Sequence, residues 1–373
     1  MNAKKTIIII SIVVGVVALG LGIYFAWNKA QKALVPASNQ QPTTNNQQLL
    51  SATEPKLKIL SKNGAFDYWI ANSTSTKSIF YISNNGNIFK INGDREEIIS
   101  NDLIENLQLI KVSPDNKMVL IKSGRQGTFH INIFNSEKNI WQPALLGISV
   151  ADFSPDGKKI AYLTNSDLKQ ADLMIKDLVN AKQKPEKIIS INQQDFDLKW
   201  IENNAILLVP KPSFDFSSEI WKINIKTKTL LKLMSDKGMM VGWSKFGDLG
   251  LKFSAAANNS YNFSLIDNSG VDKAAFKFLT FPDKCLISGP SQIYCAVPRN
   301  QDVFSRLVFP DDYLKRGVYF QDGIYQIDLA QNKFQTLFQE ESPLIDAVNL
   351  KISGNRLLFI NRYDNRLYSL AIQ

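Results

Sequence analysis

Histidine is nearly absent from this sequence, and the scarcity limits the chemistry available to the protein. The one histidine among 373 residues, His130, lies in an alternating segment where a strand residue is a better interpretation than a catalytic base. The chain contains no Gly-x-Ser-x-Gly turn, His-Glu-x-x-His helix, phosphate-binding glycine loop or dinucleotide fingerprint. Enzymatic activity would therefore rest on carboxylates alone, and the adjacent Asp311 and Asp312 are of a kind usually just solvated. We expect no catalytic residue, metal site or cofactor.

Runs of basic residues are also missing, although the formal net charge is +9. Four lysines and Glu54 give residues 1–55 a net charge of +3, which leaves +6 for the rest of the chain. That remainder is spread along the sequence and forms no Lys/Arg cluster. A solvated, mildly basic surface is therefore favoured over a nucleic-acid-binding stripe, and weak attraction to anionic envelope polymers is the alternative.

Charge is absent altogether from residues 7–26, which are mainly Ile, Val, Leu and Gly. This is the length that a helix needs to cross a bilayer, and we expect a transmembrane signal anchor over residues 6–27. A cleaved signal peptide is the main alternative, but its apolar region is normally shorter. The absence of cysteine near this segment excludes a lipoprotein anchor.

The expected anchor places the protein in the cytoplasmic membrane as a single-pass protein. Residues 1–5 would be a short cytoplasmic tail, and the bulk of the chain would lie on the extracytoplasmic side. Small residues four apart, Ser11 with Gly15 and Ala18 with Gly22, would let two such helices pack closely, although such residues are common in any membrane span. Residues 28–55 are rich in Gln, Asn, Thr and Pro, and we expect a disordered linker.

Only two cysteines are present, Cys285 and Cys295, and their spacing predicts a bridge. The segments on either side of residues 289–291 are typical of two strands of a hairpin. Pairing Ser288 with Gln292 places Cys285 opposite Cys295, near enough for a disulfide. Two free buried thiols are the alternative, and the expected extracytoplasmic address favours the disulfide.

A short strand of alternating apolar residues recurs along the chain at intervals of roughly 40 residues, a period typical of propeller blades. The copies are residues 88–92, 130–134, 173–177, 220–224, 261–265, 324–328 and 366–370. We assign each copy to the third strand, c, of a four-stranded blade whose strands are labelled a to d from the central channel outward. The prediction is an all-β, seven-bladed β-propeller over residues 56–373, with six or eight blades as alternatives because several copies are degenerate.

The clearest blade has strands at residues 150–154, 159–163, 173–178 and 186–190. Between its strands a and b lies Ser154-Pro155-Asp156-Gly157, in which Pro presets φ, Asp can bond its own backbone and Gly supplies a positive φ. The tetrapeptide at residues 113–116 repeats this turn with Asn in the last position.

The segment from Phe153 to Tyr162, Phe-Ser-Pro-Asp-Gly-Lys-Lys-Ile-Ala-Tyr, resembles the blade repeat of TolB-type and WD-repeat-like β-propellers. The match is strong over two blades and looser over residues 57–373. In that family the turn is structural, so the resemblance implies a fold that binds through its loops and implies no catalytic residue.

The last blade ends with its strand c, while residues 57–60 form an apolar strand without a partner. We expect this segment to supply strand d of the seventh blade, which would close the ring and remove an exposed sheet edge.

Two insertions, residues 210–218 and 298–317, separate strands b and c of the fourth and sixth blades, so both should emerge on the face opposite the Ser-Pro-Asp-Gly turns. They carry the aromatic, arginine and acidic residues that we expect to bind a partner. The candidates are Phe214, Phe216, Phe304, Arg306, Phe309, Asp311, Asp312, Tyr313 and Arg316. The alternative is that these aromatics fold back over the blade as a structural lid.

These features together predict a membrane-anchored binding or assembly scaffold for an envelope protein or glycan. The alternative is a carboxylate-dependent, glycan-active propeller enzyme. An enzyme would need two or more buried acids with perturbed pKa values that converge in one funnel.

Overall fold

The computed structural model describes residues 55–372 except 73–76, 103, 126–127, 166–169, 181, 194, 246 and 258–259. The expected tail, transmembrane anchor and all but the last residue of the expected linker lie outside the described residues. Within the described part of the chain, no helix is long and apolar enough to cross a membrane.

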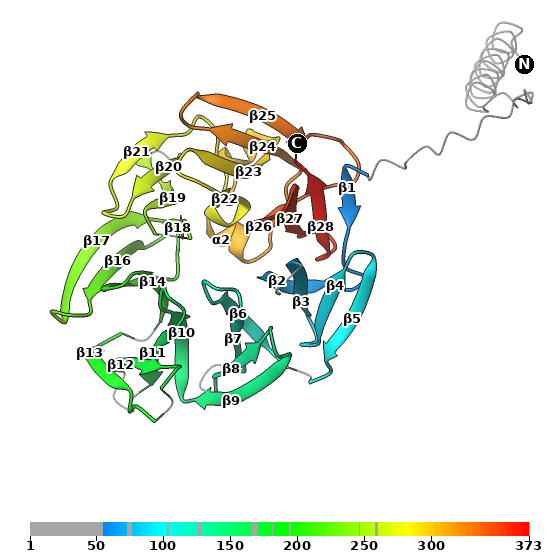
Figure 1. The fold of residues 1–373 in the computed structure, drawn as a ribbon. Helices are drawn as coiled ribbons and strands as arrows, with labels where there is room; N and C mark the ends of the chain where they lie inside the picture. Colours follow the sequence, from blue (N-terminus) through cyan, green and yellow to red (C-terminus); the bar gives the residue numbers. More distant parts are fainter. Residues whose placement is uncertain are drawn as a thin grey trace, which may run out of the picture. The chain divides into compact units, whose positions relative to one another are not determined.

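Seven antiparallel four-stranded sheets form a ring, which confirms the predicted seven-bladed β-propeller (Figure 1). Blade 1 contains β2 (Ala65–Asn72), β3 (Lys77–Ser83), β4 (Ile88–Asn92) and β5 (Arg95–Ser100). Blade 2 contains β6 (Leu107–Val112), β7 (Met118–Ser123), β8 (His130–Asn135) and β9 (Ile140–Leu146). Blade 3 contains β10 (Ile148–Phe153), β11 (Lys159–Asn165), β12 (Ala171–Asp177) and β13 (Glu186–Ile191).

The other four blades continue around the ring. Blade 4 contains β14 (Phe196–Glu202), β15 (Ala205–Pro210), β16 (Ser217–Asn224) and β17 (Thr229–Lys237). Blade 5 contains β18 (Met240–Trp243), β19 (Leu249–Ala255), β20 (Tyr261–Asp267) and β21 (Asp272–Ala275). Blade 6 contains β22 (Cys285–Ile287), β23 (Gln292–Pro298), β24 (Asp322–Asp328) and β25 (Lys333–Phe338). Blade 7 contains β26 (Ala347–Ser353), β27 (Arg356–Asn361), β28 (Leu367–Ala371) and β1 (Leu57–Ile59).

Blade 7 is completed by the N-terminal strand β1, as the sequence predicted. Leu57 pairs with Leu370 and Ile59 with Tyr368 in an antiparallel ladder. The ladder is extended at both ends by hydrogen bonds from Ala371 N to Lys56 O and from Leu60 N to Leu367 O, each 2.7 Å long. The backbone edge of β28 is therefore paired, and the ring is closed by both ends of the propeller sequence.

The apolar core is divided into layers between adjacent blades. Between blades 3 and 4, Leu163 and Leu173 pack against Leu198 and Leu208. At the closure, Tyr68 and Tyr81 of blade 1 pack against Leu358 and Ile360 of blade 7. Each strand thus buries apolar side chains on the faces that meet its neighbours, because alternate residues of a strand point to opposite faces of the sheet.

The turn at residues 154–157 has the geometry that its residue types predict. Gly157 has φ +70° and donates its N–H to Ser154 O at 2.8 Å. Ser154 Oγ donates to Asp156 Oδ1 at 2.6 Å and accepts from Lys159 N at 2.9 Å. Asn116 takes the equivalent position in blade 2 with φ +61°. These bonds hold strands a and b together at one end of the channel.

We predict that closure depends on the side of β1 that faces the blade. Leu57 packs against the core between blades 6 and 7, whereas Ile59 is exposed. Leu57→Asp places a charge against apolar side chains and should lower the melting temperature by about 5 °C. Ile59→Asp, the control in the same strand, should change it by about 1 °C or less. Equal losses in thermal melts would contradict this account of the closure.

In blade 6, Cys285 of β22 lies opposite Cys295 of β23, the register that the sequence predicted, and a disulfide joins them. We predict that intact-mass measurement of the chain, denatured in alkylating reagent without reductant, will show no added label. Prior reduction should allow two labels. Two labels without reduction would show that the protein carries free thiols.

Candidate functional site

The long insertion of blade 6 leaves β23 at Pro298 and returns at Asp322, passing through η3 (Gln301–Ser305) and α2 (Asp311–Leu314). Its aromatic residues Phe304, Phe309 and Tyr313 are buried. Tyr313 stacks on Phe281, with ring centroids 4.0 Å apart, and Phe304 stacks parallel to Phe320 at 6.0 Å. The three side chains predicted to anchor a partner are therefore part of the core. The insertion, residues 298–317, has the structure of the lid alternative, and we call it the lid.

The lid is also fastened to blades 4 and 5. Tyr261, at the start of β20, donates its hydroxyl to Leu307 O and accepts from Phe309 N, both at 3.0 Å. Asp311 Oδ2 accepts from Phe214 N at 2.7 Å, so the two insertions touch. Asp312 Oδ2 accepts from Val308 N at 2.8 Å. The adjacent acids thus organise the backbone of the two insertions.

Three other candidates remain at the surface of this face. Arg306 and Arg316 are exposed, and Arg316 Nη1 donates to Asn365 Oδ1 of blade 7 at 2.9 Å. Phe216 is 73% exposed, whereas Phe214 is half-buried and packs near Tyr261. The structure therefore gathers no continuous cluster of exposed aromatic residues from the nine predicted positions.

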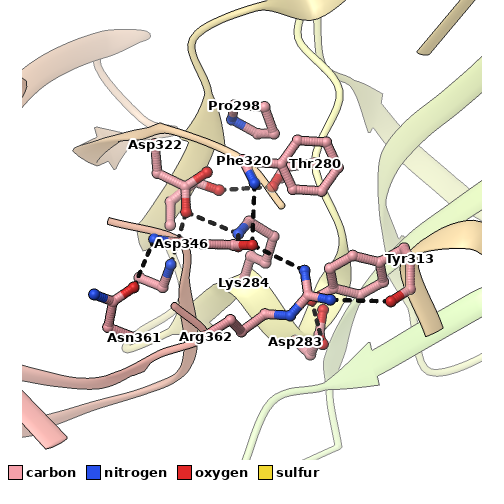
Figure 2. Close-up of polar contacts among 12 residues, drawn as sticks. Thr280, Asp283, Lys284, Pro298, Tyr313, Phe320, Asp322, Asp346, Asn361 and Arg362 are labelled. Carbon is pink, nitrogen blue, oxygen red and sulfur yellow. Dashed lines mark hydrogen bonds and ion pairs between the residues drawn. The ribbon is translucent and has the colours of Figure 1, made fainter. Parts of the chain in front are cut away.

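Under the lid lies a cluster of buried charges that no local sequence pattern indicates (Figure 2). Lys284, from η2 (Pro282–Lys284), contacts Asp322 at 2.8 Å and also binds Asp346. Arg362 Nη1 lies 2.9 Å from Asp346 Oδ2. The Lys284, Asp322 and Asp346 side chains have no exposed surface.

The backbone completes this network. Asp322 Oδ2 accepts from Ala347 N at 2.8 Å, and Asp346 Oδ2 accepts from Phe320 N at 3.1 Å. Arg362 Nη2 donates to Tyr313 O at 3.1 Å, and the Tyr313 hydroxyl donates to Asp283 Oδ2 at 2.7 Å. The cluster therefore joins the lid to the start of blade 7.

Burial and ion pairing act in opposite directions on the pKa values of the cluster. Burial raises the pKa of Asp322 to about 6, although the attraction of Lys284 acts in the other direction. Burial also raises the pKa of Asp283. Burial would lower the pKa of Lys284, but Asp322 and Asp346 together outweigh it and the pKa is raised. Lys284 is therefore held as a cation between two carboxyls that share it.

A second feature, at the opposite end of the ring, is open. A cavity of about 420 Å³ lies where the turns between strands a and b surround the channel, and residues of all seven blades line it. From blade 1 to blade 7, one residue of each is Trp69, Val112, Phe153, Trp200, Ser244, Leu286 and Ile352. We call this cavity the channel mouth. Repeating blades place the end of every strand a at the same height, which is why one cavity collects residues from the whole ring.

The charged residues of the channel mouth are mostly cationic. Lys77, Lys199, Lys245 and Lys351 line it, against the single acid Asp152. Asp152 is buried, and its two oxygens accept from Phe153 N at 3.0 Å and Trp200 N at 2.8 Å. Its charge is thus partly satisfied by backbone donors within the wall.

The four lysines differ in whether they have a hydrogen-bond or ion-pair partner. Lys351 donates to Tyr68 O and lies 3.7 Å from Asp67. Within the part of the chain that the structure describes, Lys77, Lys199 and Lys245 have no carboxylate within ion-pair distance. The channel mouth therefore presents a positive potential to an incoming ligand.

The wall beneath the channel mouth is held by ion pairs between blades. Lys111 of blade 2 lies 2.6 Å from Asp197 of blade 4. Burial would lower the pKa of Lys111, but Asp197 and Asp152 outweigh it and the pKa is raised. A charged lysine at this point joins blades that are not adjacent, so the inner ring is braced on this side.

Among the described residues, no group of three His, Cys, Asp or Glu side chains is arranged to hold a metal ion. The two features therefore differ in chemistry. The buried cluster fixes a loop, whereas the channel mouth has volume, access and unpaired cations.

The raised pKa of Asp322 predicts a specific dependence of stability on pH. Folded Asp322 titrates at about 6, and an unfolded aspartate titrates near 3.9. Between these values the folded state binds more protons, so this carboxyl contributes stability that is full below about pH 4 and lost as the pH rises through about 6. Asp322→Asn removes this titration. The melting temperature of the wild type relative to that of the variant should fall by roughly 5 °C between about pH 4 and pH 7.

Asp302→Asn, at an exposed position of η3, controls for loss of a carboxylate elsewhere. If the melting temperatures of the wild type and of Asp322→Asn change equally with pH across this range, Asp322 does not titrate there.

No model of a known protein family matches the chain, and no curated protein matches its sequence. Solved structures do resemble it. An oligogalacturonate lyase from Vibrio parahaemolyticus has a TM-score of 0.60 at 10% identity, over 87% of this chain and 95% of that one. The β-propeller domain of Cps50 (Swd1) from Myceliophteria thermophila has a TM-score of 0.51 at 9% identity, over 85% and 100%. An oligogalacturonate lyase in complex with manganese has a TM-score of 0.51 at 10% identity, over 80% and 83%.

At these identities the likeness shows the fold alone. The resemblance to TolB-type and WD-repeat-like propellers is therefore supported as a β-propeller and stays a prediction at the level of the family. Because the similar structures include an enzyme and a β-propeller domain of another kind of protein, the fold does not decide between catalysis and binding.

Proposed function

We propose that this protein is a membrane-anchored scaffold whose propeller, on the extracytoplasmic side, captures an acidic segment of an envelope protein in the channel mouth. The observation that carries the proposal is the excess of lysines in a cavity that all seven blades line. Three of them lack a carboxylate partner among the described residues. A ligand with carboxylates would supply the missing counter-charges.

The walls favour a peptide over an acidic glycan. Between the lysines lie apolar residues at the ends of strands a, including Val112, Phe153 and Ile201. A segment that alternates acidic and aliphatic residues would match both components, whereas an acidic glycan would leave the apolar wall without a partner. A cavity of about 420 Å³ accommodates a short segment and not a folded domain.

The expected anchor over residues 6–27 supports the proposed location, and so does the disulfide between Cys285 and Cys295, because such bonds persist in oxidising compartments. In this proposal residues 28–55 are the linker that lets the propeller reach its partner. The lysines line a cavity and do not form a surface stripe, so we expect no specific nucleic-acid binding.

A carboxylate-dependent glycan enzyme is the second candidate, because Asp283, Asp322 and Asp346 converge and burial raises the pKa of two of them. Asp322 and Asp346 have no exposed surface, and Lys284 binds both. This activity would require the lid to open and the ion pairs to break. The channel mouth needs no rearrangement, which makes binding the better-supported function.

We predict that reversing charge in the channel mouth abolishes capture of an acidic peptide. A labelled peptide of alternating Glu and Leu serves as the probe, and its Gln/Leu counterpart is the uncharged comparison. Lys77→Glu, Lys199→Glu and Lys245→Glu combined in the full chain should weaken binding roughly 100-fold, at about 1 kcal/mol for each lost pair. The measurement is fluorescence anisotropy at physiological salt.

The matched control reverses Lys226, Lys273 and Lys333, which are exposed at the outer edge of the ring. It changes the net charge by the same amount and should leave binding within about twofold, because screening removes most of the effect beyond a Debye length of about 8 Å. Equal weakening by both triple variants would show that net charge, and not the channel mouth, attracts the peptide. Equal binding of the Glu and Gln peptides would also contradict the proposal.

A further inference from the structure

The face that carries the lid has a second cavity, of about 480 Å³, where the insertion leaves β23 and returns toward β24. We call it the lid groove. One exposed aromatic residue, Tyr319, lines it, together with the polar residues Arg299, Asn300, Gln321 and Glu341. None of these five belongs to the set of partner-binding residues that the sequence predicted.

Tyr319 is held in place from below by the buried charge cluster. The Arg362 guanidinium carbon lies 5.0 Å from the centre of the Tyr319 ring and 4.3 Å from that of Tyr313. Arg362 itself is fixed by Asp346 at 2.9 Å. Tyr363 packs beside Tyr319 with ring centroids 5.4 Å apart, and each tyrosine is 42% exposed. The Arg362 cation against the Tyr319 ring and the Tyr363 ring beside it hold Tyr319 in one orientation before a ligand binds.

The polar side chains of the lid groove retain unused hydrogen-bonding groups. Asn300 Oδ1 accepts from Asp302 N at 3.0 Å, which leaves its amide N–H groups. Gln321 Nε2 donates to the backbone oxygens of Glu340 at 3.3 Å and Glu341 at 3.0 Å, which leaves its carbonyl oxygen. Arg299 and Glu341 are exposed and form no ion pair within the described part of the chain. Donors and acceptors are thus both available, and the formal charges of the lining cancel.

From this combination we infer that the lid groove binds a neutral saccharide. The C–H face of a pyranose ring is weakly positive and apolar, and it complements the negative face of an aromatic ring. Vicinal hydroxyls both donate and accept, and planar groups such as guanidinium, carboxamide and carboxylate can bind them in pairs. A peptide of one charge would find no excess of the opposite charge here, in contrast to the channel mouth. The inference does not rest on the proposed function, because the two cavities lie at opposite ends of the ring.

The test uses saturation-transfer-difference NMR of the full chain with neutral cello-, xylo-, malto- and chito-oligosaccharides. Saturation should pass from the protein to the pyranose C–H protons of at least one series. Tyr319→Ala should weaken that binding by about tenfold, since aromatic contacts of this kind are worth on the order of 1 kcal/mol or more. Tyr319→Phe keeps the ring and should retain binding within about twofold.

Phe334→Ala is the matched control, because Phe334 lies on the outer strand β25 and is 52% exposed. It should retain binding. If Tyr319→Ala lowers the melting temperature, Arg299→Leu alters an exposed side chain of the same groove without touching Arg362, and its loss of binding supports the inference instead. Absence of transfer to all four series would overturn it, as would transfer that survives both Tyr319→Ala and Arg299→Leu. The channel-mouth triple lysine variant should bind the saccharide normally, so failure of one proposal leaves the other measurable.

Discussion

The pairing of β1 with β28 is the constraint on which the rest of the structure depends. Blade 7 obtains only three strands from the C-terminal end of the chain, and an unpaired β28 would leave a row of backbone donors and acceptors at a sheet edge. β1 satisfies them, and its Leu57 packs against the core between blades 6 and 7. Only a closed ring fixes the seven strands a around one axis. The channel mouth and the orientation of both loop faces are consequences of this closure.

The two faces then differ because their connections differ. The turns between strands a and b of blades 2 and 3 are short, and their own side chains close them, as Ser113 with Asp115 and Ser154 with Asp156 show. On that face the lysines that line the channel mouth come from strands, as Lys77 and Lys199 do, and from one turn, which carries Lys245. The connections between strands b and c differ in length, and the aromatic residues of the longest one pack over blades 5 and 6. Burying Lys284 with Asp322 and Asp346 is not in itself a strong source of stability, because desolvation opposes the ion pairs. Its effect is to specify one position for the lid.

Local sequence patterns made the fold predictable. The site was not predictable, because the residues that interact there lie far apart in the sequence. The alternating strands, the turn at residues 154–157 and the register of Cys285 with Cys295 each depend on a few neighbouring residues, and the structure agrees with them. Phe304, Phe309 and Tyr313 have the residue types of a binding surface and of a core alike. Their burial depends on Phe281 and Tyr261, which precede the insertion and give it no local signal. Lys284, Asp322, Asp346 and Arg362 have no characteristic spacing, and the channel mouth combines strands from the whole chain.

The buried cluster also connects the lid to the lid groove through one residue. Arg362 contacts the rings of Tyr313, inside the lid, and Tyr319, at the surface. Its position is set by Asp346, which also binds Lys284, whereas Asp322 binds Lys284 and the backbone of Ala347. Protonation of Asp322 therefore removes one counter-charge of Lys284 but leaves the pair of Asp346 with Arg362 in place. A cation without sufficient counter-charge is costly in the interior, so Lys284 then depends more on Asp346. Asp346 is therefore held more tightly, and it is the carboxylate that positions Arg362 against Tyr319. The orientation of Tyr319 can thus tolerate the titration of Asp322, because Arg362 keeps its ion pair with Asp346.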